Sequence, residues 1–168
     1  MLEPIEISNL VEKIYLSSLP LFEKEILITG GPTYEKIDPV RFIGNHSSGI
    51  MGFELAKKAL SLGAKVNLIS GPTFLDLKQN NLELIRVFST QEMYEESVKK
   101  FSSADIVIFS AAVSDFTPEK FFNKKIKKEI DLKSLKLKKT IDILGFLGKN
   151  KKNQFLIGFA LETDNNIE

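Results

Sequence analysis

The stretch Glu25-Ile26-Leu27-Ile28-Thr29-Gly30-Gly31-Pro32 decides the fold of this 168-residue chain. A short, nearly continuous apolar run that ends in Gly and Pro is typical of a strand buried on both faces of a parallel sheet. Residues 1–24, which precede it, carry apolar side chains at helical spacing and then Ser-Ser-Leu-Pro. We therefore expect an N-terminal helix and linker over residues 1–24, and the main domain over residues 25–168.

Outward from this strand, helical and strand patterns alternate. A loop to about Ser47 precedes a helix from Ser48, which Gly63 ends. A second helix is expected from Thr90, with the Thr90 side chain as its cap, and a third over residues 142–149. Four further strands are expected, at residues 65–70, 82–88, 105–109 and 155–159. A short hairpin is expected after Pro118.

Strand–helix–strand units of this kind have right-handed crossovers in nearly all proteins. The pattern predicts an α/β fold, namely a Rossmann-like, mainly parallel sheet with helices on both faces.

Composition excludes several functions. The absence of cysteine removes disulfides, thiolate catalysis and cysteine metal sites, and the single His46 rules out a multi-histidine site. The net charge of +1 provides no overall attraction to nucleic acid or membranes. No apolar run approaches the roughly 18–20 residues that span a bilayer, and the acidic start is unlike a signal peptide. We expect a cytoplasmic protein without nucleic-acid or membrane partners.

Ligands of open parallel sheets bind at the carboxyl ends of the strands, where small residues let them approach the backbone. Those ends carry Gly30-Gly31, Gly71, Ala111-Ala112 with Asp115, and Phe159. Residues 45–49 directly precede a helix, whose first amides suit a polyphosphate. Lysines crowd residues 120–152, a pattern that by itself is typical of a solvated surface.

Other nucleotide and hydrolase motifs are absent from the sequence. The turn after the first strand lacks Gly-x-Gly-x-x-Gly, and the second strand ends in Ser70-Gly71-Pro72 where NAD enzymes usually carry an acid. No P-loop occurs, and a hydrolytic triad is disfavoured because a Gly-x-Ser-x-Gly elbow is also missing. A Rossmann oxidoreductase stays open as an alternative that NAD(P)H binding would support.

Residues 38–49, Asp-Pro-Val-Arg-Phe-Ile-Gly-Asn-His-Ser-Ser-Gly, closely resemble the signature of phosphopantothenate–cysteine ligases. Five further blocks match that family in the same order, namely residues 26–33, 70–72, 111–116, 125–128 and 158–163. The likeness covers residue 25 to the end. Residues 2–7 also resemble the tail of the flavin-dependent decarboxylase that is fused ahead of this ligase in many bacteria. No flavin is expected in this chain. A decarboxylase partner is expected, either fused to it or separate.

The resemblance implies a two-step reaction of coenzyme A biosynthesis. CTP, with Mg²⁺, activates the carboxylate of 4′-phosphopantothenate as an acyl-cytidylate, and L-cysteine then attacks it. Asn45 matches the position that handles the acyl-cytidylate, and its alternative role is a cap at the helix entry. Arg41 is the second catalytic candidate because it could bind a phosphate or carboxylate; its alternative is an ion pair with Asp38 or Glu35. No direct protein ligand for the metal is identified, and a homodimer is implied.

The nucleotide-binding candidates combine the strand ends with residues carried over from the resemblance. They are Gly30, Gly31, Ser48, Gly49, Gly71, Ala111, Ala112, Asp115, Lys125, Lys127, Asp142, Ile143, Leu144 and Phe159. By resemblance Asp115 contacts the nucleotide, and Lys125 or Lys127 reaches the triphosphate; an extended segment would place both lysines on one side. Phe159 is expected to pack on the cytosine, with a core phenylalanine as the alternative.

The sequence departs from the family in two places. Ile50 stands where the family usually has lysine, and the family continues after Asp164 with a helix that bears further lysines. We therefore expect weak or absent ligase activity from this chain by itself, with a non-catalytic nucleotide-binding module as the alternative. CTP is implied by the family and by no residue spacing, since some relatives use ATP.

Overall fold

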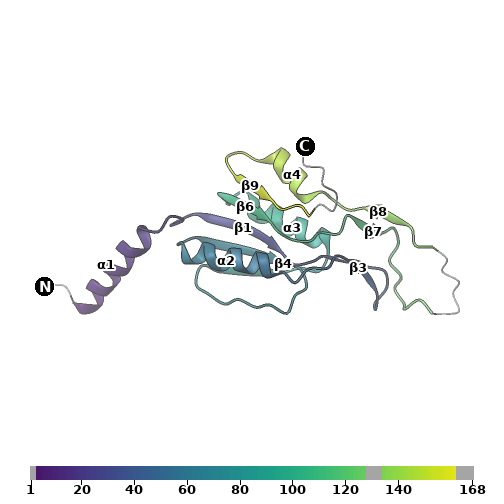
Figure 1. Ribbon diagram of the computed structural model, residues 1–168, viewed down its shortest axis with the longest axis horizontal. Helices are drawn as coiled ribbons and strands as arrows, with labels where there is room; N and C mark the ends of the chain where they lie inside the picture. Colours follow the sequence, from purple (N-terminus) through teal and green to yellow (C-terminus); the bar gives the residue numbers. More distant parts are fainter. Residues whose placement is uncertain (1–2, 128–133, 162–168) are drawn as a thin grey trace.

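The computed structural model describes residues 3–127 and 134–161. These residues contain a parallel five-stranded sheet with helices on both faces, which confirms the predicted α/β, Rossmann-like fold (Figure 1). The strands are β1 (Glu25–Gly30), β4 (Lys65–Ser70), β5 (Leu82–Arg86), β6 (Ile106–Phe109) and β9 (Phe155–Gly158). Their spatial order is β5-β4-β1-β6-β9. The strands that follow β1 in the sequence, β4 and β5, lie on one side of β1, and the later strands β6 and β9 lie on the other side. The strand order therefore reverses between β1 and β6.

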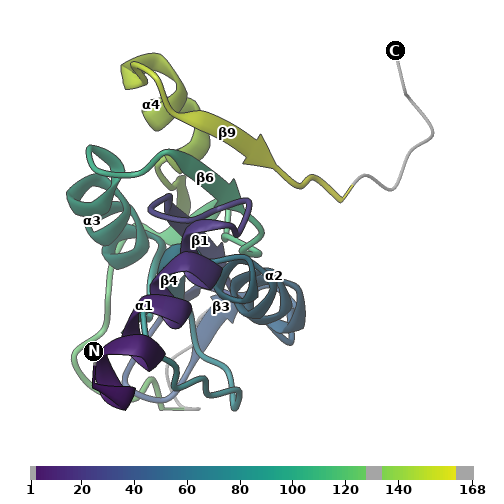
Figure 2. The same ribbon diagram turned by 90° about the vertical axis from the view of Figure 1, so that its left-hand side faces the viewer.

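The alternation of β1 side chains divides the core into two layers. Ile26 and Ile28 face α2 (Ile50–Ser61), which buries Phe53 against the sheet. Leu27 faces the other side, where α3 (Thr90–Phe101) and α4 (Ile143–Asn150) cover the sheet and Leu147 is buried. Figure 2 shows α2 and α3 on opposite sides of the sheet. The short apolar run predicted as a doubly buried strand is therefore the centre of the molecule.

The expected element ends differ from the structure by one or two residues. The strand expected at 82–88 ends at Arg86, that at 105–109 begins at Ile106, and that at 155–159 ends at Gly158. The helix expected from Ser48 begins at Ile50. The reason is Gly49, whose left-handed φ of 79° cannot belong to the helix.

Thr90 does not cap its helix, contrary to the prediction. Ser89 is extended, and its hydroxyl accepts a hydrogen bond from Glu92 N at 3.3 Å, so Ser89 is the cap. Thr90 is already helical, and its buried hydroxyl lies 2.9 Å from the hydroxyl of Thr33.

The segment expected as a loop before Ser47 contains a short hairpin of β2 (Tyr34–Lys36) and β3 (Phe42–Gly44). The ring of Tyr34 stacks on that of Phe42 with centroids 4.0 Å apart. This hairpin follows β1, at the place where a dinucleotide-binding fold puts the first turn of a helix.

A second antiparallel pair joins β7 (Phe116–Pro118) to β8 (Leu137–Lys139). The hairpin expected after Pro118 was thus right in kind and wrong in position, because its first strand ends at Pro118. Residues 128–133, which include Lys128 of the resembling block, lie outside the described residues.

The N-terminal helix α1 (Pro4–Ser17) extends away from the sheet (Figure 1). The linker after it returns to the body of the molecule, where Leu21 N donates a hydrogen bond to Leu62 O at 2.9 Å. Within residues 3–127 and 134–161, no helix is both long and apolar enough to cross a membrane.

Candidate functional site

A cavity of about 470 Å³ opens at the carboxyl ends of β1, β6 and β9. Its volume is in the range of small-molecule sites. It is lined by Thr29, Phe109, Ala111, Val113, Asp115, Phe116, Lys139, Thr140, Ile141, Asp142, Ile143, Leu144 and Phe159. The cavity therefore lies where an open parallel sheet is expected to bind its ligand, beside the reversal of strand order at β1 and β6.

Six of the predicted nucleotide-binding residues line this cavity. They are Ala111, Asp115, Asp142, Ile143, Leu144 and Phe159. Asp142 caps α4 through its Oδ1 atom, which accepts a hydrogen bond from Gly145 N at 2.8 Å. The amino end of α4 thus faces the cavity together with two carboxylates, so the site offers both amide donors and acceptors.

Phe159 follows the last strand and is 53% exposed, which removes the alternative of a core phenylalanine. Its backbone amide donates a hydrogen bond to Phe109 O at 3.0 Å and fixes the start of the segment that leaves the sheet. An aromatic ring exposed at the rim of a cavity suits stacking on a planar ligand.

Hydroxyl groups of the buried Thr33 and the half-buried Thr140 hold the walls of the cavity together. Thr140 Oγ1 donates to Ser114 O at 2.6 Å, and Thr140 N donates to Asp115 O at 2.9 Å. Ser114 N in turn donates to Thr33 Oγ1 at 2.8 Å. The loop of residues 140–144 is thereby attached to the carboxyl ends of both β1 and β6.

The sequence did not single out Lys139 or Thr29, which also line the cavity. Lys139 is the last residue of β8 and pairs with Phe116 of β7. It directly precedes the loop of residues 140–144, and this adjacency was the available signal. Thr29 is fully buried, and its Oγ1 has no hydrogen-bond partner among the described residues.

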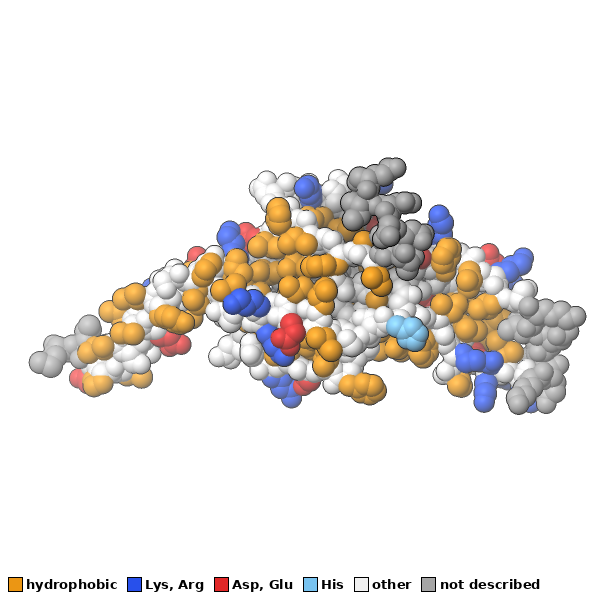
Figure 3. Space-filling model, viewed as in Figure 1, with side chains coloured by type: hydrophobic (Ala, Val, Ile, Leu, Met, Phe, Trp, Pro, Cys, Tyr) orange, Lys and Arg blue, Asp and Glu red, His pale blue; other side chains and the backbone are white. Residues whose placement is uncertain are grey.

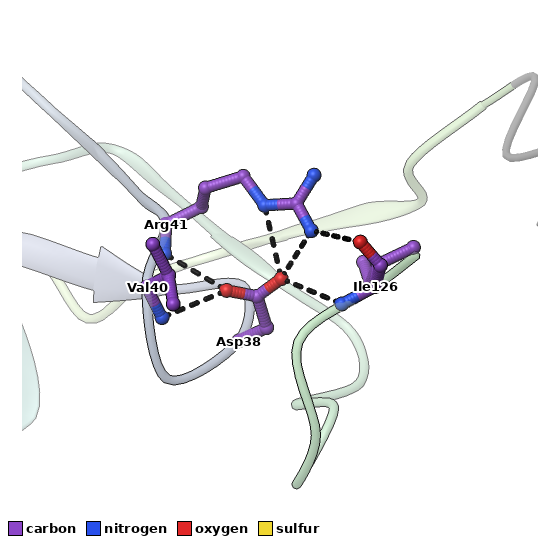
Figure 4. A network of polar contacts seen from close by, with 4 residues as sticks. All are labelled: Asp38, Val40, Arg41 and Ile126. Carbon is purple, nitrogen blue, oxygen red and sulfur yellow. Dashed lines mark hydrogen bonds and ion pairs between the residues drawn. The ribbon is translucent and has the colours of Figure 1, made fainter. Parts of the chain in front are cut away.

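Arg41 belongs to a compact network at the turn of the β2–β3 hairpin (Figure 4). Its guanidinium donates to Asp38 Oδ2 and, through Nη2, to Ile126 O at 2.8 Å. Ile126 N also donates to Asp38 Oδ2, at 3.1 Å. The ion pair with Asp38, one alternative for Arg41, is therefore formed, while 45% of the Arg41 side chain stays exposed.

The pKa of the Asp38 carboxyl is held well below its usual range. Burial opposes its ionisation, but the hydrogen bonds from Ile126 N, Val40 N and both the side chain and the backbone of Arg41 outweigh that effect. The carboxylate is thus a charged structural anchor between the hairpin and the segment around Ile126.

Lys125 and Lys127 are exposed on either side of the buried Ile126 and do not line the cavity. Burial alternates along this segment as expected, because the side chain of Ile126 is buried and those of Lys125 and Lys127 are exposed. The Asp38–Arg41 network fixes the backbone from which these lysines extend.

The glycine-rich strand ends pack against one another instead of lining the cavity. A Cβ atom on Gly71 would lie 1.6 Å from Pro32 O, and Gly31 has a φ of 74° beside Thr73. Ala112 N donates to Gly31 O at 2.9 Å. Gly30, Gly49 and Ala112 likewise lie outside the cavity lining, so these small residues permit close contact between loops.

Asn45 and Ser48 lie in the loop before α2. Asn45 Nδ2 donates to Val113 O at 2.9 Å, and Val113 lines the cavity. Asn45 does not cap the helix, because Gly49 occupies the cap position. Ser48 Oγ accepts a long hydrogen bond of 3.4 Å from Ile50 N. Asn45 is therefore next to the wall of the cavity without lining it.

Metal ligands are sparse in the part of the chain that the structure describes. Among residues 3–127 and 134–161 no group of three or more His, Asp or Glu side chains could hold a metal ion. The carboxylates at the cavity are Asp115 and Asp142.

Residues 21–168 match the protein family described as the DNA/pantothenate metabolism flavoprotein C-terminal domain. The coenzyme A biosynthesis bifunctional protein CoaBC of Bacillus subtilis (strain 168) is 49% identical over 163 residues, which cover 96% of this chain and 40% of that protein. A cysteine/cysteine sulfinic acid decarboxylase of an unknown prokaryotic organism is 46% identical over 163 residues, which cover 96% of this chain and 45% of that protein. The chain thus spans less than half the length of these curated relatives.

The fold is also similar to that of a solved structure. The crystal structure of the C-terminal domain of a coenzyme A biosynthesis bifunctional protein CoaBC aligns with a TM-score of 0.75 and 44% sequence identity. The alignment covers 88% of this chain and 69% of that one.

Proposed function

The chain belongs to the family of the DNA/pantothenate metabolism flavoprotein C-terminal domain, and on that premise we propose that it catalyses the CTP-dependent ligation of 4′-phosphopantothenate to L-cysteine in coenzyme A biosynthesis. The observation that carries this proposal is the cavity at the ends of β1, β6 and β9. It brings Asp115, residues 142–144 and Phe159 together, although they come from separate blocks of the sequence. These are the positions at which the sequence resembles the nucleotide site of the ligases.

In the first proposed step, a carboxylate oxygen of 4′-phosphopantothenate attacks the α-phosphorus of CTP. The bond from that phosphorus to the bridging oxygen breaks, pyrophosphate leaves, and an acyl-cytidylate remains. Phe159 stacks on the cytosine, and Asp115 accepts hydrogen bonds from the nucleotide. Lys139 and the amino end of α4 provide positive potential for phosphate oxygens. Such a step depends on alignment and on charge neutralisation more than on a base.

In the second proposed step, the amine of L-cysteine attacks the acyl carbon. The bond from that carbon to the phosphate oxygen breaks, CMP leaves, and the nitrogen loses a proton to give the amide. Asn45 is the residue we assign to the acyl-cytidylate. Its amide group is held at the cavity wall by the hydrogen bond to Val113 O, and an amide can stabilise an oxyanion without adding charge.

Mg²⁺ fits the site as part of the nucleotide complex. It prefers to keep several waters and to bind one or two carboxylates together with substrate phosphates. Asp115 and Asp142 are the carboxylates at the cavity and could contribute to such a site. When bound, the metal would neutralise charge on the phosphates, and the residues named above would orient the nucleotide.

We propose a homodimer as the assembly in which the substrate site is completed. Apolar side chains that are exposed in the single chain gather on the β2–β3 hairpin, on β7 and on the segment that follows β7. They are Val40, Phe42, Phe116, Phe121 and Phe122. Because Phe116 also lines the cavity, an interface here would adjoin the site. Sedimentation equilibrium tests this assembly, and a monomer at micromolar concentration would contradict it.

Two measurements test the proposed reaction. Isothermal titration of the chain with CTP is expected to give a saturable heat, and ATP a weaker one. A coupled assay is then expected to detect at most slow pyrophosphate release from this chain by itself, and that release should require both CTP and 4′-phosphopantothenate. CTP binding without turnover would instead support a non-catalytic nucleotide-binding module. An absence of CTP binding would contradict both functions.

A further inference from the structure

Two buried side-chain hydroxyls, those of Thr29 and Ser97, have no hydrogen-bond partner among residues 3–127 and 134–161. Such atoms are rare in native proteins and call for an explanation. The exposed apolar side chains that Figure 3 shows along α1 and across the body are, by contrast, common on protein surfaces. Thr29 lines the cavity at the strand ends, whereas Ser97 lies in α3 and does not line it. Within the described residues, Thr29 alone therefore combines an unsatisfied hydroxyl with a place in a cavity of ligand size.

The hydroxyl groups near Thr29 find their partners within the protein. Thr33 Oγ1 accepts a hydrogen bond from Ser114 N at 2.8 Å, and Thr140 Oγ1 donates to Ser114 O at 2.6 Å. Ser110 Oγ donates to the backbone carbonyl of Thr29, also at 2.6 Å. The backbone oxygen of Thr29 is thus bonded while its side-chain oxygen is not. The missing partner is a property of this one side chain and not of this end of the sheet.

The surroundings of Thr29 would suit a valine. Thr29 stands in register with Ile69 of β4 and with Phe109 of β6, and both of these apolar residues are buried. Valine has the same branched shape, is favoured in strands and would leave no polar atom unpaired. The hydroxyl therefore lowers the stability of the free chain. A local choice that lowers stability is typical of a functional site.

The strand order indicates which part of a nucleotide lies near Thr29. The strand β6 lies between β1 and β9. Neighbouring strands are about 4.8 Å apart, so the strand ends that carry Thr29 and Phe159 are separated by roughly 10 Å. This separation is comparable to the length of a base with its ribose. A nucleotide whose base stacks on Phe159 can therefore extend its nucleoside portion to the end of β1.

We propose that Thr29 is a nucleotide-binding residue, whose hydroxyl takes its missing hydrogen-bond partner from the nucleoside portion of the bound nucleotide. A threonine hydroxyl both donates and accepts, so a ribose hydroxyl and a polar edge of the base are both suitable partners. This contact rests on the proposed function, because it belongs to the same cavity. Binding of the nucleotide then satisfies a group that the free chain leaves unsatisfied.

The test replaces Thr29 by valine in the full chain and measures both thermal unfolding and calorimetric titration with CTP and with CMP. The melting temperature of free Thr29→Val is expected to equal or exceed that of the unaltered chain, because no hydrogen bond within the protein is lost. Its affinity for CTP and for CMP should fall by the same factor, about 3- to 10-fold. Thr29→Ser keeps the hydroxyl and should bind both nucleotides within about twofold of the unaltered chain.

Ser97→Ala is the matched control, because it also removes a buried hydroxyl without a partner in the described structure, away from the cavity. It should keep or raise the melting temperature and leave CTP affinity unchanged.

Several results would overturn the proposal. If the unaltered chain binds CTP and Thr29→Val binds it equally well, the Thr29 contact is wrong and the proposed function stands. A loss of affinity confined to CTP would place the contact at the outer phosphates and not at the nucleoside. A lower melting temperature of Thr29→Val, together with an equal loss of affinity in Thr29→Ser, would assign the effect to packing. An unaltered chain that binds no CTP would contradict both the contact and the proposed function.

Discussion

Asp38 and Arg41 are joined at two points, since Asp38 Oδ2 accepts hydrogen bonds from Arg41 Nε at 2.9 Å and from Arg41 Nη2 at 2.5 Å. The carboxylate is only 1% exposed, and its other oxygen accepts from Val40 N at 2.8 Å and from Arg41 N at 2.9 Å. Through Ile126 the same pair holds the segment that carries Lys125 and Lys127. One ion pair therefore joins two parts of the chain that are more than eighty residues apart.

Asp38→Asn is expected to destabilise the fold at neutral pH and to do so less as the pH falls. The pKa of Asp38 is lowered in the folded chain, so its ionised form contributes stability above the unfolded pKa of about 3.9. That contribution is lost as the pH falls through the lowered folded pKa. Urea unfolding at pH 7 and at pH 3 measures the difference in the free energy of unfolding between the variant and the unaltered chain. Glu54→Gln, in an exposed pair with Lys57, is the control. A difference in the free energy of unfolding that does not change with pH would contradict this explanation.

Phe159→Ala is expected to weaken CTP binding roughly 5- to 150-fold, because stacking of a base on an aromatic ring contributes about 1–3 kcal/mol. Phe155→Ala is the matched control, since Phe155 is 65% exposed at the opposite end of the same strand and does not line the cavity. Calorimetric titration compares the two variants. Similar losses from both would show that β9 is disturbed as a whole and that Phe159 is not a ligand contact.

Thr140→Val is expected to cost about 1 kcal/mol of stability, because it removes the hydrogen bond to Ser114 O. It should also weaken CTP binding, since that bond attaches the loop of residues 140–144 to the end of β6. Thr140→Ser keeps the hydroxyl and should restore most of both properties. Denaturant unfolding and CTP titration are the measurements, and a serine variant as impaired as the valine variant would show that loss of the hydroxyl does not account for the effect.

Ile50→Lys restores the charge that the resemblance places at this position and tests where the triphosphate lies. A charge-assisted contact contributes about 1.5–3 kcal/mol, so CTP affinity should rise about tenfold or more if phosphates lie at the start of α2. Met51→Lys is the control, because Met51 is the next residue of the helix and equally exposed, at 52% against 55%. No gain from Ile50→Lys, or an equal gain from both, would place the phosphates elsewhere.

Gly71→Ala is expected to destabilise the fold by about 1–3 kcal/mol or more, as overpacking does. The added Cβ would lie 1.6 Å from Pro32 O, so the loops after β1 and β4 would have to separate. Thermal unfolding measures this loss. If Gly71 is a ligand contact only, the variant would keep its melting temperature and lose CTP affinity instead.

The sequence predicted the sheet well because its strands are short apolar runs with Gly or Pro at their ends. Residues 25–30 and 65–70 are examples. The β2–β3 hairpin was missed because its strands have three residues each, which is too short for any period to be recognised. The cap of α3 was misplaced because Ser89 and Thr90 are both good caps, and only tertiary contacts with Thr33 decide between them.

The predicted site residues fall into two groups, those that line the cavity and those whose loops pack against each other. Those at the ends of β6 and β9 and at the start of α4 meet in one cavity, as parallel strands require. Gly30, Gly31 and Gly71 follow the same rule of position, but the loops that bear them pack on each other. A sequence pattern predicts at which edge of a sheet the small residues lie. It does not predict whether the loops that carry them leave room for a ligand. The role of Phe159 stays a prediction for the titrations above, and the role of Asn45 stays a prediction as well.

The position of β9 has a consequence for synthesis on the ribosome. This strand pairs with β6 at one side of the sheet, and Phe159 follows it immediately. The strands β1, β4, β5 and β6 all emerge earlier and can assemble while translation continues. A nucleotide that needs Phe159 therefore cannot assist nascent forms in which β9 has not yet emerged, because the ligand favours only states that already contain the site. Cellular nucleotide levels should then affect the lifetime of this protein more than the yield of its folding.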